Sequence, residues 1–132
     1  MRRFFLTVAT AASVLAVTSC SDATGIRGDV VGSYELQSIN GQFLPATFGD
    51  VTYTIGELEL ETDGTFFDTY QYQVFGDGFV ETEQTSGTWE RDGSRIRFET
   101  NNGNVYFMER TSSNRLTYVD SDDGSRWVYT RF

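Results

Sequence analysis

Hydrophobic and polar residues alternate along most of the chain after residue 31, and clusters of turn residues interrupt the alternation at intervals of about 8–12 residues. A period of two is typical of a β-strand with one buried face, and these segments are rich in the β-branched and aromatic residues that strands favour. No segment shows the apolar stripe of an amphipathic helix. The pattern predicts eight strands, at residues 32–39, 51–61, 65–74, 79–90, 95–100, 104–110, 115–121 and 125–132.

The connections between these segments are short and rich in glycine, asparagine, aspartate and serine, at residues 62–64, 76–78, 92–93, 101–103, 113–114 and 123–124. Such residues supply the positive φ angles that tight hairpins need. Strands joined by hairpins are antiparallel neighbours, and about eight strands make a barrel whose interior either fills with side chains or holds one small ligand. The sequence therefore predicts an all-β fold, an eight-stranded antiparallel up-and-down barrel over residues 31–132.

The alternation also assigns side chains to the two faces of each strand. Leu58 and Leu60 alternate with glutamates at 57, 59 and 61, so we expect the leucines to face the interior and the glutamates to face solvent. Tyr53 has the opposite parity to Leu58, which predicts a bulge or bend near Gly56. The same rule predicts that Arg95, Arg97 and Glu99 point outward and that these residues point inward: Phe66, Tyr70, Tyr72, Trp89, Ile96 and Phe98.

The first 19 residues have a different pattern. A positively charged Met1-Arg2-Arg3 precedes an apolar run over residues 4–17 and a small polar pair, Thr18-Ser19. The apolar run is shorter than the roughly 20 residues that a membrane span needs, so residues 1–19 are predicted to be a cleaved signal peptide. Residues 17–20, Val-Thr-Ser-Cys, resemble the bacterial lipobox, which implies that Cys20 is acylated. The alternative is an ordinary signal peptide that leaves Cys20 as a free thiol.

The expected location is the bacterial cell envelope, facing the periplasm or the exterior. Residues 20–30 are mostly polar and contain two glycines, which is typical of a flexible tether between a lipid anchor and a domain. Ser21 follows Cys20 where lipoproteins retained in the inner membrane of enteric bacteria carry aspartate, which favours the outer membrane. Arg2-Arg3-Phe4 also resembles a twin-arginine motif, so either export route remains open.

Charge and composition limit the classes of partner, metal site and reaction that this chain can support. The net charge is −9, and without Arg2 and Arg3 eight arginines against 19 acidic residues leave −11, which disfavours nucleic acid as a partner. With one cysteine and no histidine, a disulfide within the chain, common zinc sites and a histidine-activated nucleophile are excluded. Glu81 and Glu83 share a strand face and are interpreted as solvated neighbours. We expect no enzyme activity, no cofactor and no metal site.

One acidic segment superficially resembles the start of a calcium loop, at residues 120–124, Asp-Ser-Asp-Asp-Gly. The twelfth position of such a loop would need a glutamate, and Arg131 occupies it. The segment is therefore predicted to be an acidic hairpin turn.

Several short motifs together resemble the lipocalin-like (calycin) domains of bacterial envelope lipoproteins. They lie at residues 31–36 (VGSYEL), 40–45 (NGQFLP), 58–66 (LELETDGTF), 86–89 (SGTW) and 96–98 (IRF). Gly32-Ser33-Tyr34 is similar to the Gly-x-Trp opening of lipocalins, which implies that Arg126 or Arg131 packs across Tyr34. The middle lipocalin motif has no match, and no C-terminal helix follows the last strand, which departs from the lipocalin pattern with a deep ligand cup.

Two functions remain open. The barrel could bind a small apolar ligand, because tyrosine and tryptophan offer an apolar ring with a polar group. The candidate contacts are Tyr34, Tyr70, Tyr72 and Trp89, with Phe43 and Leu44 from the long connection at 40–50 closing the mouth. The same aromatics could instead pack a filled core, with that connection as a plug. The chain would then be an anchored structural or interaction module whose acidic face meets a basic protein partner, although acidic charge also keeps a domain soluble.

Overall fold

The computed structural model describes residues 29–132, which contain ten strands and no helix. The strands are β1 (Gly32–Ile39), β2 (Gln42–Phe43), β3 (Ala46–Phe48), β4 (Val51–Leu60), β5 (Thr65–Val74), β6 (Val80–Asp92), β7 (Arg95–Thr100), β8 (Val105–Ser112), β9 (Arg115–Val119) and β10 (Arg126–Arg131). The predicted signal peptide, acylated Cys20 and the tether up to residue 28 lie outside the described residues. Within residues 29–132, no helix is long and apolar enough to span a membrane.

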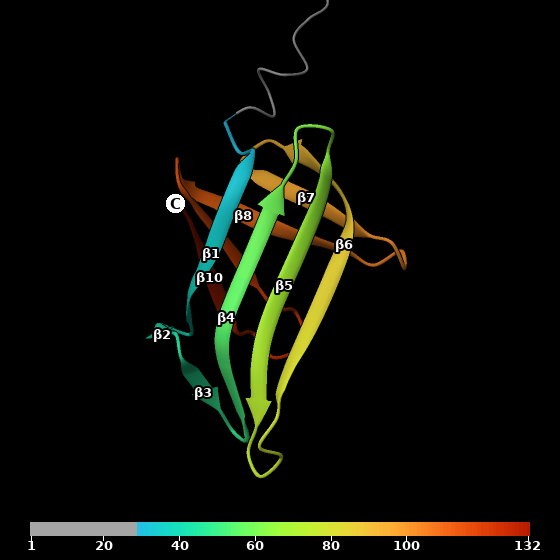
Figure 1. The fold of residues 1–132 in the computed structure, drawn as a ribbon. Helices are drawn as coiled ribbons and strands as arrows, with labels where there is room; N and C mark the ends of the chain where they lie inside the picture. The colour runs from blue at the N-terminus through green and yellow to red at the C-terminus, as the bar shows by residue number, and fades with distance from the viewer. Residues whose placement is uncertain (1–28) are drawn as a thin grey trace, which may run out of the picture.

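Eight of these strands close into an antiparallel up-and-down barrel (Figure 1). Each strand from β4 to β9 pairs with the next one along the chain, and β1 pairs with both β10 and β4. The closing pair joins residues 32–35 of β1 to residues 57–60 of β4, so the eight strands form a complete ring. The predicted barrel is confirmed. The short strands β2 and β3 lie in the 40–50 connection and pair with β1 and β4.

The predicted strands agree with the observed ones to within a few residues, and β1, β5 and β7 have the expected bounds. Glycines in five of the six predicted turns adopt positive φ angles between 64° and 93°. The turn at residues 113–114 is an exception, since neither Ser113 nor Asn114 has a positive φ. Our expectation there was wrong because β8 contains an irregular register between Arg110 and Ser112, and such a bulge adds the twist that a left-handed residue would otherwise supply.

The predicted change of parity in β4 is present. The pairing of β4 with β5 shifts register between Tyr53 and Ile55, just before Gly56, so that Tyr53 and Leu58 both face the interior. Gly56 itself is buried, and a Cβ atom there would lie 2.6 Å from the Cβ atom of Leu36. Glycine at this position therefore lets β1 and β4 approach each other where the barrel closes.

Hydrophobic side chains fill the half of the barrel where the described chain begins. These side chains are almost completely shielded from solvent and come from β1, β4, β5, β6, β7 and β9. The predicted inward positions of Leu58, Leu60, Phe66, Trp89, Ile96 and Phe98 are confirmed. They include Tyr34, Leu36, Leu58, Leu60, Phe66, Trp89, Ile96, Phe98 and Leu116. The rings of Phe66 and Phe98 meet edge to face with centroids 5.0 Å apart. This half of the barrel is a packed core.

Asp29 ties the start of the described chain to the strand ends. Its carboxylate accepts hydrogen bonds from Arg91 of β6 at 2.7 and 2.8 Å and from Arg110 of β8 at 2.6 Å. Partial burial acts against ionisation, but the two arginines outweigh it and lower the pKa of Asp29. Asp29 and Val30, which we had assigned to the tether, therefore interact with the barrel, and Val30 is fully buried.

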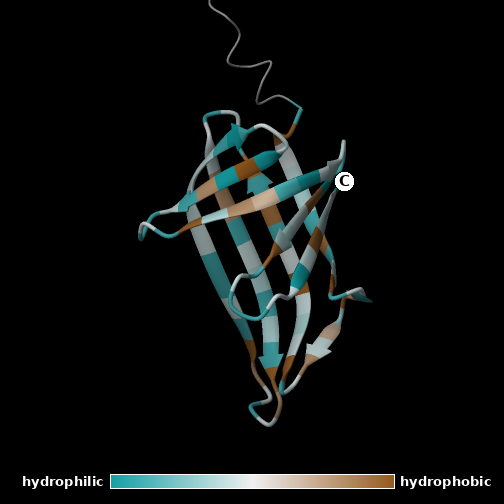
Figure 2. Ribbon diagram, turned by 180° about the vertical axis from the view of Figure 1, so that it is seen from behind, coloured by the Kyte–Doolittle hydropathy of each residue, from teal (hydrophilic) through white to brown (hydrophobic). Residues whose placement is uncertain are grey.

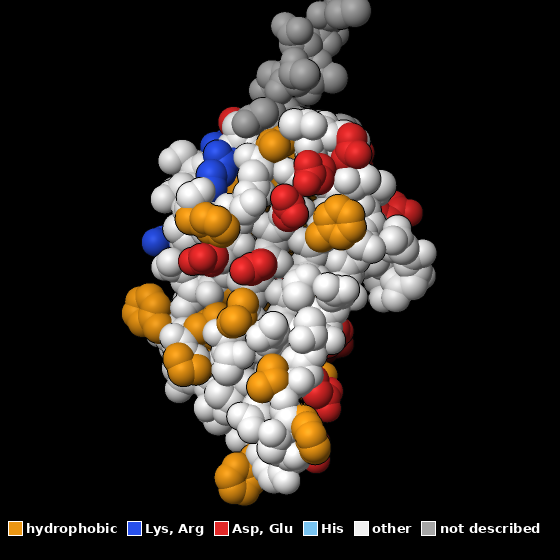
Figure 3. Space-filling model, viewed as in Figure 1, with side chains coloured by type: hydrophobic (Ala, Val, Ile, Leu, Met, Phe, Trp, Pro, Cys, Tyr) orange, Lys and Arg blue, Asp and Glu red, His pale blue; other side chains and the backbone are white. Residues whose placement is uncertain are grey.

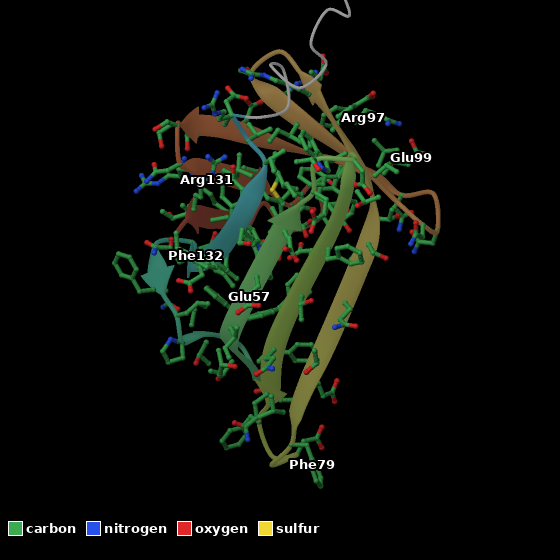
Figure 4. The ribbon with its side chains drawn as sticks, turned by 45° about the horizontal axis from the view of Figure 1, so that its top comes forward. Glu57, Phe79, Arg97, Glu99, Arg131 and Phe132 are labelled. Atoms are coloured by element: carbon green, nitrogen blue, oxygen red, sulfur yellow. The ribbon has the colours of Figure 1, made fainter. Side chains whose placement is uncertain are left out.

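Tyr34 and Arg131 complete the seal at this end of the barrel. The Arg131 guanidinium lies 5.1 Å from the centre of the Tyr34 ring and donates to the Tyr34 hydroxyl at 2.7 Å. It also donates to the backbone carbonyl of Asp29 at 2.8 Å, while the Tyr34 hydroxyl donates to the carbonyl of Val30 at 2.7 Å. The packing of an arginine across Tyr34 is thus confirmed, and the arginine is Arg131. Figure 4 shows Arg131 at this end and Phe79 at the opposite tip.

Candidate ligand-binding cavity

The other half of the barrel is open because its walls differ in length. Residues 80–86 of β6 pair with β5 alone, since the pairing of β6 with β7 begins at Gly87 and Thr100. β4, β5 and the first half of β6 therefore extend past the shorter strands β7 to β10 (Figures 1 and 2). The inner face of this extension looks toward the β7–β8 and β9–β10 hairpins and toward Trp127 of β10.

A cavity of about 410 Å³ lies between the extension and these two hairpins. This volume is within the range of roughly 300–1,000 Å³ that is usual for small-molecule sites. The lining comes from β5, β6, β8, β9, β10 and both hairpins, and it includes Asp68, Tyr70, Glu83, Thr85, Tyr106, Met108, Tyr118, Asp120, Trp127 and Tyr129. The cavity is thus at the end of the barrel opposite to Asp29.

Aromatic rings form much of this lining. Tyr106 stacks on the core residue Phe98 with centroids 4.9 Å apart and meets Tyr118 edge to face at 5.5 Å. Trp127 lies 5.7 Å from Tyr70 and 5.1 Å from Tyr53, and its indole nitrogen donates to the Ser125 hydroxyl at 2.9 Å. The rings pack against one another, which fixes the shape of this part of the lining.

The tyrosine hydroxyls in the cavity are protonated at neutral pH. Burial is the main cause that raises the pKa of Tyr70, Tyr106 and Tyr129, and the neighbouring Asp68 raises each of them further. Each hydroxyl is therefore a neutral group that can donate one hydrogen bond and accept others, and the Tyr129 hydroxyl already donates to Asp68.

Among residues 29–132, Asp68 is the only acidic or basic residue that is almost completely buried, with 4% of its surface exposed. It lies on β5 at an inward position between Phe66 and Tyr70. Burial raises its pKa to about 7, and the nearby Glu83 acts in the same direction. The Tyr129 hydroxyl opposes this shift through a long hydrogen bond of 3.5 Å, and the backbone of Thr69 also opposes it. Asp68 therefore exchanges its proton in the neutral range.

The charged side chains that line the cavity are all acidic. Asp68, Glu83 and Asp120 are part of the lining, and no arginine is among the lining residues that the structure describes. Two neighbouring tyrosines are affected by this charge: beyond the effect of burial, Glu83 and Asp120 raise the pKa of Tyr53, and Asp120 raises that of Tyr118. The cavity and its mouth thus form a region of negative potential.

The closed barrel is lipocalin-like in architecture. Comparison with solved structures finds an uncharacterized protein from Bacteroides eggerthii, 9% identical, with a TM-score of 0.44 over 77% of this chain and 98% of that one. It also finds a lipocalin-like protein from Bacteroides uniformis, 15% identical, with a TM-score of 0.43 over 80% of this chain and 100% of that one. No family model matches the sequence, and no curated protein matches it.

The six candidate ligand contacts are dispersed, and Tyr70 is the one among them that lines the cavity. Tyr34 and Trp89 belong to the packed half, where the Trp89 indole donates to the carbonyl of Glu61 at 3.1 Å. Tyr72 lies beyond the cavity and donates to Glu81 at 2.9 Å. Phe43 is 75% exposed, and Leu44 packs on the edge of the core.

The 40–50 connection covers the wall where β1 and β4 diverge. Leu44 donates its backbone N–H to the carbonyl of Gln37, Ala46 is buried, and Phe48 packs on the core. None of the described residues in this connection is part of the cavity lining. The connection therefore packs against the side of the barrel and does not cover the mouth of this cavity, and the alternative of a plug that seals one end stays a prediction.

The cavity residues that were not predicted from the sequence lie at the same inward-facing positions of their strands as the residues that were predicted. Asp68 lies two positions from both Phe66 and Tyr70, so the same alternation points it inward. Thr85 and Glu83 likewise share the parity of Trp89. Glu83 is exposed to solvent, as we expected, and it also lines the cavity. An acidic residue at an inward position was the available signal.

The acidic segment at residues 120–124 is a hairpin turn, as predicted. The Asp120 carboxylate accepts the backbone N–H of Asp122 at 2.7 Å, and the Asp123 carboxylate accepts that of Ser125 at 2.7 Å. Gly124 has a φ of 74° and donates its N–H to the carbonyl of Asp120. Two of the acidic side chains thus stabilise the turn at the cavity mouth.

Proposed function

We propose that this protein is a lipid-anchored binding protein of the bacterial cell envelope whose barrel holds a small molecule. The observation that supports this function best is the division of the barrel into a packed half and an open half. A barrel that served only as a rigid spacer would have no need for a cavity of about 410 Å³ lined with braced aromatic rings.

The position of the cavity suits an anchored receptor. The described chain begins at the sealed end, where Asp29 bonds to Arg91 and Arg110. A tether from that end to an acylated Cys20 would leave the cavity mouth directed away from the membrane. A ligand would then enter from the aqueous phase, from the periplasm or the exterior.

The residues that line the cavity indicate a more specific class of ligand than the sequence did. The aromatic rings favour a molecule with an apolar body, as expected, but Thr85, Asn102 and Asn104 add hydrogen-bonding groups at the wall and rim. An amphipathic small molecule therefore fits this cavity better than a purely apolar one. We propose binding rather than catalysis as the role, and the protonated hydroxyls of the cavity, which are not activated nucleophiles, support this.

Equilibrium dialysis against a low-molecular-weight bacterial extract tests the proposal, with mass spectrometry of whatever the protein enriches. The variant Thr85→Trp places a large side chain in the cavity, whereas Gln84→Trp adds the same side chain at the neighbouring exposed position. We expect wild type and Gln84→Trp to enrich the same compound and Thr85→Trp to enrich none. Equal enrichment by all three proteins, or none by wild type, would rule the cavity out as the binding site.

A second candidate function rests on the outer face of β1 and β4. Glu35 lies directly opposite Glu57, and Glu59 and Glu61 follow on the same strand and its end. Several acidic side chains are visible on this side of the molecule in Figure 3, and Figure 4 labels Glu57 on β4. Like charges directly opposite each other destabilise a sheet, and Glu59 raises the pKa of Glu61. No salt bridge within residues 29–132 involves these four carboxylates. A basic protein partner would relieve the repulsion.

This second function predicts a salt-sensitive interaction. A pull-down with wild type should recover a basic protein at low salt, and the double variant Glu57→Gln, Glu59→Gln should lose it. Retention by the double variant, or the absence of any specific partner at both low and moderate salt, would contradict it.

A further inference from the structure

We infer that the cavity is selective for a small organic cation whose ammonium group lies at Asp68, an inference that rests on the proposed binding function. Three features of the cavity support it: a buried carboxyl group without a basic partner, a lining whose charges are all negative, and a set of aromatic faces beside that carboxyl group.

The surroundings of Asp68 contain no compensating positive charge. The titratable groups that face it are Glu83 from β6, Tyr70 from β5, Tyr106 from β8 and Tyr129 from β10. From β4, the residue paired with Asp68 is the apolar Leu58. Buried carboxylates in proteins are usually paired with a cation, because an unpaired charge loses its hydration without compensation. A cation that arrives with the ligand would supply the positive charge that the lining around Asp68 does not provide.

Arginines are available in this chain, but they lie elsewhere. The described ion pairs use Arg91 and Arg110 at the sealed end and Arg95 and Arg97 on the outer face of β7. Asp68, Glu83 and Asp120 take part in none of the described ion pairs, whereas two arginines neutralise the carboxylate of Asp29. An anionic ligand would face three carboxyl groups in the lining and no arginine.

The aromatic lining suits the same ligand. The face of a tyrosine or tryptophan ring attracts a cation within about 6 Å, and desolvation strengthens this attraction. Tyr70, Tyr106, Trp127 and Tyr129 all line the cavity together with Asp68. Ammonium groups that carry an apolar body would therefore find both a counter-ion and ring faces in one enclosure.

Matched pairs of probes separate charge from shape. Choline and its neutral isostere 3,3-dimethyl-1-butanol form one pair, and phenethylamine and 2-phenylethanol form the other. Isothermal titration calorimetry at pH 8 should show each cation binding at least about tenfold more tightly than its neutral partner. Choline keeps its charge at every pH, so its affinity should fall about tenfold between pH 8 and pH 6 as Asp68 takes up a proton. The affinity for the alcohols should change little over that range.

The variant Asp68→Asn removes the charge and keeps the shape, and Asp77→Asn makes the same change at an exposed loop. We expect Asp68→Asn to lose the preference for cations and Asp77→Asn to retain it. Circular dichroism will establish that both variants fold, and the pH dependence of choline binding to wild type tests Asp68 without any variant.

The possible outcomes distinguish the binding function of the cavity from its selectivity for cations. Equal binding of cations and alcohols by wild type would leave the binding function in place and overturn the selectivity. A preference for cations that persists in Asp68→Asn, or that shows no dependence on pH, would overturn the assignment to Asp68. No saturable binding of any of the four probes at millimolar concentration would overturn the cation inference, while enrichment of an uncharged compound in the dialysis experiment would still support a binding function.

Discussion

The raised pKa of Asp68 predicts that the stability of the protein depends on pH in a specific direction. The pKa is about 7 in the fold and 3.8 in the unfolded reference. The folded state therefore binds the proton more tightly, and protonated Asp68 favours folding. The stabilisation of the fold by protonated Asp68 is complete below pH 4, declines as the pH rises, and is lost above pH 7. The difference of about 3 pKa units corresponds to about 4 kcal/mol.

The substitution Asp68→Asn isolates this contribution. Asparagine cannot ionise, has nearly the same shape, and keeps an oxygen that accepts the Tyr129 hydroxyl. The variant should therefore be more stable than wild type by about 4 kcal/mol at pH 8, and the difference should shrink to about 1 kcal/mol at pH 4.5. Urea unfolding followed by tryptophan fluorescence measures both values.

A matched control accounts for the general effect of removing one negative charge. Asp77→Asn does so at an exposed loop and should change stability by a similar small amount at both pH values. If the difference between Asp68→Asn and wild type did not vary with pH, or if the variant were the less stable protein at pH 8, the carboxylate would be satisfied within the fold. Asp68 would then need no positive charge from a ligand, which would contradict the inference that a cation binds there.

Other substitutions test separate parts of the structure. Arg131→Ala should destabilise the fold by about 2–3 kcal/mol in urea unfolding, because it removes two hydrogen bonds and the cover over Tyr34, whereas Arg115→Ala should be nearly neutral. Gly56→Ala should cost about 1–3 kcal/mol in the same assay, since its methyl group would overlap Leu36. Trp127→Phe should abolish the fluorescence change that accompanies ligand binding, and a change of the same size in this variant would place the ligand elsewhere. Cys20→Ala should shift the protein from the membrane fraction to the soluble fraction, and an unchanged distribution would contradict the lipobox.

Much of the fold could be predicted because each local signal is independent of the others. Alternation locates a strand, and glycines such as Gly64 and Gly103 locate a turn, so the order and direction of the strands follow without any long-range information. The packed half follows as well, since Leu58, Phe66 and Trp89 are large apolar residues at inward positions. The pairing of Arg131 with Tyr34 came from the family resemblance rather than from the alternation.

The cavity could not be located in the same way because its position depends on unequal strand lengths. Trp89 and Tyr70 have the same inward parity, yet one is surrounded by core side chains and the other faces an opening. The difference arises where β6 continues for seven residues before its pairing with β7 begins at Gly87. Parity identifies the face of a strand but gives no information about what lies across the barrel from it. The interaction of Asp29 with the strand ends is equally non-local.

The most direct test of the binding account is a native mass spectrum of the full-length protein after mild extraction from its own membranes. A denatured spectrum recorded alongside it gives the mass of any acyl chains on Cys20. The account predicts an acylated chain that also contains a small molecule in the native spectrum and loses it on denaturation. A native spectrum that shows only the acylated chain, unchanged after the four cationic and neutral probes are added, would contradict the account and leave the acidic outer face as the functional surface.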